Sequence, residues 1–93
     1  MTSVKRVESK VGRLEGFDVR IRHSHGRDVR ADKGRMPTYP YERKAKDSMT
    51  VKQWIARRFG RHYAGYRVEV LDWYRKPQRG NTKLGKVRES FFE

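Results

Sequence analysis

The stretch TVKQWIARRF, residues 50–59, constrains the fold more than any other part of the chain. Thr50 followed three residues later by Gln53 is the pattern of a capping box, in which each side chain hydrogen-bonds the backbone N–H of the other residue. Apolar residues recur at i, i+3, i+4 and i+8, which places them on one stripe of a helix; they are Val51, Trp54, Ile55 and Phe59. We therefore predict a helix that covers a core and ends at Gly60.

Four further segments are predicted as strands. Apolar and charged residues alternate in residues 17–22 and again in residues 66–70, which is the period of a half-buried strand. The turn residues HSHG, 23–26, predict a hairpin whose return strand begins near Val29 and Ala31. The segment KLGKVRESFFE, 83–93, is expected to add a short last strand, with Leu84 and Val87 as its core contacts.

The remaining segments set the predicted domain organisation. Residues 1–15 are basic and are expected to form an N-terminal arm, which could also fold as a short amphipathic helix. Residues 16–93 are expected to form one domain, since a chain of this length suits a single small core. Residues 33–48 are predicted to be a basic loop or edge, because Pro37 and Pro40 cannot donate to a central ladder.

The element order and two local patterns resemble those of the ubiquitin-like β-grasp proteins. DSMTVKQWIARRF, 47–59, is similar to the polar turn and helix start of that family. YRVEVL, 66–71, followed by NTKLGKVR, 81–88, is similar to its third strand and a later Thr-x-Leu segment. The resemblance implies a small α+β fold, with a β-grasp-like mixed sheet packed on one helix. The loop at 33–48 is longer than the family pattern and the chain ends in SFFE rather than Gly-Gly, so conjugation is not implied.

The charge of the chain indicates its class of partner. The formal net charge is +13, with 24 Lys and Arg against 11 Asp and Glu. Such an excess raises the local concentration of polyanions. Arginines outnumber lysines, and a guanidinium makes bidentate phosphate contacts and stacks on bases. The sequence predicts binding to nucleic acid, RNA or DNA, or alternatively docking on an acidic protein surface.

The sequence also excludes several classes of protein. It has no cysteine, so it contains neither a disulfide framework nor a thiolate zinc site. No apolar run approaches the roughly 20 residues of a membrane span, and we expect no membrane partner. The N-terminus lacks the apolar segment of a secretory signal, and Glu8 and Glu15 argue against a transit peptide. A cytoplasmic location is therefore the expectation.

The candidate interface combines bases with aromatic residues. From Met49 to Arg67 the chain carries five bases and no acid, whereas an ordinary surface helix mixes both signs. Arg58 lies close to the apolar stripe and must extend to solvent or find a partner. The predicted phosphate-binding residues are Lys52, Arg57, Arg61, Arg67, Arg35, Arg43 and Lys44.

Tyr39 and Tyr41 lie among loop bases, so they are predicted either to stack on unpaired nucleotides or to cover the core, with at least one ring expected in the core. Trp73 and Tyr74, beside Arg75, present the same two alternatives.

Catalysis and metal binding remain minor alternatives. His62 lies near three basic or phenolic residues and suggests acid–base cleavage of RNA, as in small basic ribonuclease toxins. A single histidine among arginines is common without catalysis, so a non-enzymatic role without a cofactor is preferred. His23 and His25 would share one face of a strand, but no third metal ligand is evident.

Overall fold

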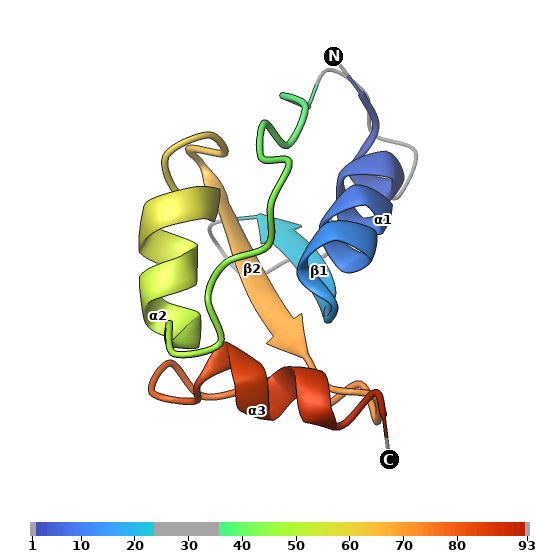
Figure 1. Ribbon diagram of the computed structural model, residues 1–93. Helices are drawn as coiled ribbons and strands as arrows, with labels where there is room; N and C mark the ends of the chain where they lie inside the picture. The colour runs from blue at the N-terminus through green and yellow to red at the C-terminus, as the bar shows by residue number, and fades with distance from the viewer. Residues whose placement is uncertain (1, 24–35, 93) are drawn as a thin grey trace.

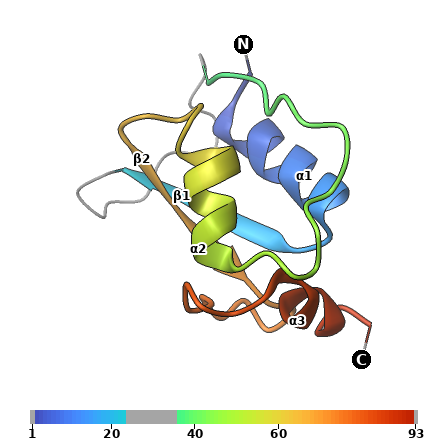
Figure 2. The same ribbon diagram turned by 60° about the vertical axis from the view of Figure 1, so that its left-hand side comes forward.

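The computed structural model describes residues 2–23 and 36–92. It confirms a small α+β protein (Figure 1). Its elements are α1 (Val4–Glu15), β1 (Asp18–His23), α2 (Val51–Trp54), η1 (Ile55–Phe59), β2 (Tyr66–Leu71) and α3 (Leu84–Glu89). Helices α1 and α2 contribute to one core on the same face of the sheet, and α3 lies at the end where β2 finishes (Figures 1 and 2).

Helix α1 is part of this core, which corrects the expectation that residues 1–15 form an arm outside the domain. The side chain of Ser3 caps its first turn, and Gly16 ends it with a positive φ of 81°. That left-handed backbone conformation favours glycine. The helix buries Val4, Val7, Val11 and Glu15. The valines, spaced three and four residues apart, therefore form the face of α1 that packs on the core.

The sheet of the described residues contains β1 and β2 in antiparallel register, with Val19 opposite Val70 and Ile21 opposite Val68. Both strands were predicted, and the alternation holds, since these four apolar side chains are buried. The predicted return strand at Val29 and Ala31 lies outside the described residues. The partner of β1 is thus a strand more than forty residues further along the chain.

Residues 36–50, which we call the crossing segment, run between α1 and α2 (Figure 1). Met36 pairs with Thr2 in an isolated bridge, and Tyr39 and Ala45 are fully buried. Lys10 Nζ donates to Tyr39 O at 2.5 Å, which holds the segment against α1. The loop predicted here is confirmed over its described part, but it contributes to the core instead of lying only on the surface.

The predicted helix forms, and its capping box is present. Thr50 Oγ1 accepts from Gln53 N at 3.2 Å, and Gln53 Oε1 accepts from Thr50 N at 3.0 Å. The last turn widens into one turn of π-helix, η1, closed by a 2.6 Å bond from Gly60 N to Ile55 O. Trp54 is fully buried, and its ring meets Phe17 edge-on at 5.2 Å.

The segment predicted as a last strand is helix α3. Leu84, Val87 and Arg88 are its buried residues, at i, i+3 and i+4. Leu84 and Val87 are confirmed as core contacts, but a spacing of three puts two side chains on one face only in a helix. The sheet therefore gains no strand from this segment. The ubiquitin-like resemblance remains a prediction.

No helix within residues 2–23 and 36–92 is long and apolar enough to cross a membrane.

Candidate nucleic-acid interface

A buried carboxylate organises the centre of the molecule. Glu15 ends α1 and has no exposed surface. Its Oε2 accepts from the hydroxyl of Tyr39 at 2.6 Å and from Nη1 of Arg58 at 2.8 Å. Its Oε1 accepts from Ala45 N at 2.8 Å and from Nη2 of Arg88 at 3.2 Å. One side chain thus ties α1 to the crossing segment, η1 and α3.

This network accounts for the position of Arg58, whose side chain turns inward instead of joining the candidate interface. Its guanidinium also donates to Arg43 O at 2.6 Å and lies 4.4 Å from the centre of the Tyr41 ring. Its hydrogen bonds to Glu15 and Arg43 are both charge-assisted and the side chain is only 18% exposed, so Arg58 is committed mainly to the interior network. Its partner Glu15 lies 43 positions away in sequence, so no local pattern identifies it.

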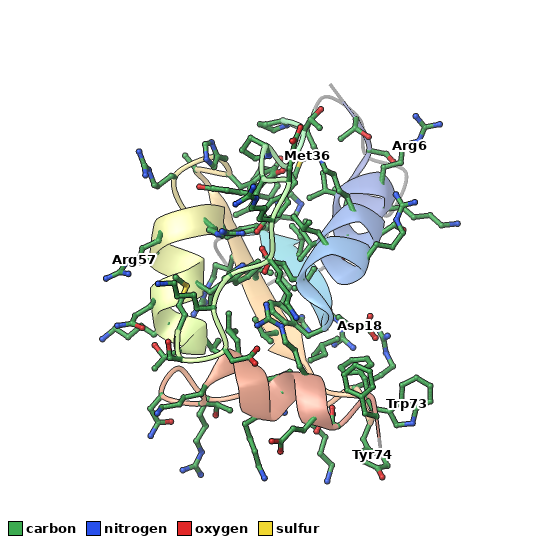
Figure 3. All side chains as sticks on the ribbon, viewed as in Figure 1. Arg6, Asp18, Met36, Arg57, Trp73 and Tyr74 are labelled. Carbon is green, nitrogen blue, oxygen red and sulfur yellow. The ribbon has the colours of Figure 1, made fainter. Side chains whose placement is uncertain are left out.

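The rest of the helix surface is basic and unpaired. Lys52, Arg57 and Arg61 are exposed, and none of them makes an ion pair with a carboxylate of the described residues. Figure 3 shows Arg57 projecting from α2–η1 into solvent, on the side of the molecule away from Arg6. The bond from Arg58 to the Arg43 carbonyl brings exposed Arg43 alongside η1. We call Arg57, Arg61 and Arg43 the helix basic face, since Lys52 lies five and nine residues before Arg57 and Arg61 and therefore on the opposite flank of the helix.

Lys44 belongs to an adjacent hollow. The hollow has a volume of about 460 Å³ and is lined by three lysines, Lys44, Lys83 and Lys86; we call it the lysine hollow. Both of its acidic residues are already paired, Asp47 with Arg88 at 2.6 Å and Glu89 with Lys86 at 3.8 Å.

Lys83 and Lys86 were missed because their segment was predicted as a strand. In a strand a spacing of three places two side chains on opposite faces, whereas on a helix it places them on one.

Lys52, on the other flank of the helix, lies beside a second basic segment. Its backbone N–H donates to Gly80 O at 2.8 Å, and Thr50 bridges to Lys83, so the 79–83 turn lies against the start of α2. Arg79 is exposed on that turn. The start of α2 is therefore surrounded by bases from two parts of the chain.

Arg67 does not join the helix basic face. Val68 and Val70 of β2 face the core, so Arg67 lies on the opposite face of the sheet. There it is paired in register with Arg22, whose Nε donates to Glu69 Oε1 at 2.7 Å. Arg35 lies outside the described residues. The predicted bases that remain candidates lie on α2–η1 and in the crossing segment.

The two loop tyrosines do not present open rings. Tyr39 is fully buried, and its hydroxyl accepts from Trp54 Nε1 at 3.2 Å while donating to Glu15. Burial, and then Glu15, raise the pKa of Tyr39 well above its ordinary value. Tyr41 is half-buried, with Arg58 on its ring and Tyr39 at 5.1 Å. Tyr39 confirms the expectation that at least one of the two rings lies in the core, and Tyr41, with Arg58 on its ring, lacks the uncovered faces that stacking on a base needs.

Two of the three histidines, His23 and His62, lie among the described residues. His62 Nε2 lies 3.2 Å from the Tyr41 hydroxyl, and no carboxylate in the described part of the chain makes an ion pair with His62. His23 stacks on Tyr66 at 5.7 Å, and His25 lies outside the described residues. Among the residues that the structure describes, no group of three potential ligands could hold a metal ion.

Comparison with known proteins adds no family. No family model, no curated protein and no solved structure matches this chain. Its function is therefore argued from its own surface.

Proposed function

We propose that this protein is a small, non-enzymatic module that binds nucleic acid through phosphate contacts made by the helix basic face. One observation carries the proposal. Between Asp47 and Glu69 the chain has no acidic residue, and Lys52, Arg57 and Arg61 are exposed without an ion pair to any described carboxylate. Unpaired guanidinium groups are available to neutralise phosphates and release their counterions.

A contrast within the molecule supports this reading. The bases nearest to acids are already engaged: Arg22 and Arg20 with Glu69, and Arg88 with Glu15 and Asp47. The helix basic face makes no ion pair with a carboxylate of the described residues, although like charges one helical turn apart repel and cost stability. The lysine hollow next to it extends the positive surface toward α3. A backbone-tracking ligand fits such a surface better than a single small anion.

The decisive experiment measures nucleic-acid affinity against salt concentration. For the wild type we expect the logarithm of the association constant to fall linearly with the logarithm of salt. The slope should be about −0.9 per duplex phosphate neutralised, or about −0.7 for a single strand. The double variant Arg57→Glu with Arg61→Glu should bind more weakly and give a flatter slope. Binding that does not respond to salt, or that survives this reversal, contradicts the proposal.

A matched control separates the helix basic face from net charge. Lys5→Glu with Arg6→Glu changes the charge by the same amount on the exposed side of α1. Figure 3 places Arg6 and Arg57 on opposite sides of the molecule. We expect the control to lower affinity much less than the Arg57 and Arg61 reversal. Equal losses would mean that only the overall charge attracts the nucleic acid.

Two outcomes would favour the alternative functions. If the reversal abolishes capture of an acidic protein but leaves nucleic-acid binding intact, the module docks on proteins. If the purified protein cleaves RNA and His62→Ala removes the cleavage, the protein is a ribonuclease. A cytoplasmic location stays a prediction.

A further inference from the structure

The turn at residues 72–76 is held by hydrogen bonds to its backbone from the Asp72 side chain, the Asp72 carbonyl and Ser90. Asp72 Oδ1 accepts from the backbone N–H of both Tyr74 and Lys76 at 2.9 Å, and Asp72 O accepts from Arg75 N at 2.9 Å. Trp73 N donates to Ser90 Oγ at 3.0 Å, which anchors the turn to the end of α3. We call residues 72–76 the aromatic turn. Its conformation is determined without help from its two large side chains.

Those two side chains face water. Trp73 is 60% exposed and Tyr74 is 68% exposed, and Figure 3 shows both at the edge of the molecule near the C-terminus. Two adjacent exposed rings on one turn contribute little to the core and form a surface that a ligand can contact. Trp73 meets Phe91 only edge-on, with interplanar angle 80° and centroids 5.8 Å apart. The aromatic turn therefore offers the uncovered rings that Tyr39 and Tyr41 lack.

The charges of the turn indicate what kind of ligand fits. Arg75 adopts a positive φ of 62°, an uncommon conformation for a residue other than glycine. Its guanidinium lies 3.8 Å from Asp18 in an exposed ion pair, and such pairs contribute little and exchange readily. Lys76 beside it is exposed. Two aromatic rings next to two available cations are the combination that single-stranded nucleic acids require, rings for bases and cations for phosphates.

We propose that the aromatic turn is a stacking platform for unpaired bases of a single-stranded nucleic acid. This inference rests on the proposed function and narrows it from nucleic acids in general to strands with unpaired bases. A duplex would engage only the basic surfaces, since its bases are already stacked on one another. A second copy of the chain is a poorer occupant, because the rings sit beside cations that would be brought together in a symmetric contact.

The experiment compares an aromatic with an aliphatic side chain at the same position of the aromatic turn. Affinity is measured for a short oligothymidylate and for its duplex with oligoadenylate, using the wild type, Trp73→Leu, Trp73→Phe and Tyr74→Leu. We expect each leucine variant to lose about fivefold or more in single-strand affinity, while Trp73→Phe retains most of it. Duplex affinity and the salt slope should not change, since stacking neutralises no phosphate. Tyr74→Phe, which keeps the ring and removes only the hydroxyl, is the matched control and should bind like the wild type.

Fluorescence gives a second readout on the same samples. Trp54 is buried, so quenching by oligothymidylate should come from Trp73 and disappear in Trp73→Phe. If the wild type binds both probes with the expected salt slope but the leucine variants bind like it, the stacking inference is overturned and the proposed function stands. If neither probe binds in a salt-dependent way, the stacking inference and the proposed function are both overturned. If Trp73→Leu instead dissociates a wild-type dimer in sedimentation equilibrium, the aromatic turn is a self-association surface and the inference is again overturned.

Discussion

Arg57 and Arg58 are neighbours in sequence and have opposite environments. Arg58 reaches back across η1 to the buried carboxylate of Glu15, whereas Arg57 points into solvent without an ion pair to any described acid. Both are arginines on the same helical turn, so residue type and local pattern do not separate them. The comparison shows that a run of bases on a helix can hold two kinds of residue. One kind stabilises the fold, and the other leaves its charge available for a ligand.

We expect the largest loss of stability when Glu15, the carboxylate that Arg58 and Arg88 share, is removed. Glu15→Ala would leave Arg58 and Arg88 without their buried counter-ion, since Arg88 is only 6% exposed. Breaking a buried ion pair from one side typically costs about 3–5 kcal/mol. We expect a loss of that size in the free energy of unfolding, measured with chemical denaturant. Glu89→Ala removes an exposed pair and should cost less than about 1 kcal/mol. Similar losses in the two variants would mean that the buried network is not a stabilising element.

A smaller difference in stability is expected between variants of the two neighbours, Arg57 and Arg58. Arg58→Ala removes two charge-assisted hydrogen bonds and the cover of the Tyr41 ring, so we expect a loss of about 1.5–3 kcal/mol. Arg57→Ala removes an exposed side chain and should change stability by no more than about 0.5 kcal/mol. Nucleic-acid affinity should show the reverse order, with the larger loss in Arg57→Ala. If both variants lower stability equally, the division into structural and binding arginines is wrong.

The smallest effect concerns alkaline pH. Burial raises the pKa of Tyr63 to about 12, and its hydroxyl donates to Pro37 O at 2.8 Å. In the unfolded chain a tyrosine loses its proton near pH 10, so the fold should lose stability as pH rises from about 10 to about 12. Tyr63→Phe should cost only about 1 kcal/mol at neutral pH and should make the alkaline decline shallower. Denaturation curves at several pH values measure this, and an unchanged decline would contradict the assignment.

The local elements of this protein follow from sequence alone. The Thr50–Gln53 capping box, the stripe ending at Phe59 and the alternation of both strands involve residues close together in the chain. Such patterns are set by helical and strand periods, which are properties of the backbone. The charge of +13 and the acid-free stretch before Glu69 are likewise read without a structure. These features predicted the α+β class, the core helix and the region of the helix basic face.

The tertiary structure decided which of these residues remain available to a ligand. Glu15 meets Arg58 and Arg88 across 43 and 73 positions, and no local period encodes a pairing at that distance. The same packing buries Tyr39 and leaves Trp73 exposed, although both lie in aromatic and basic stretches of the chain. Helix α3 was mispredicted because it is only six residues long and has no side-chain cap, so the spacing of Leu84 and Val87 was the main helical signal and was overlooked. Local periodicity thus determined the capped helix and both strands, whereas burial, which depends on the whole chain, determined which charges and rings face water.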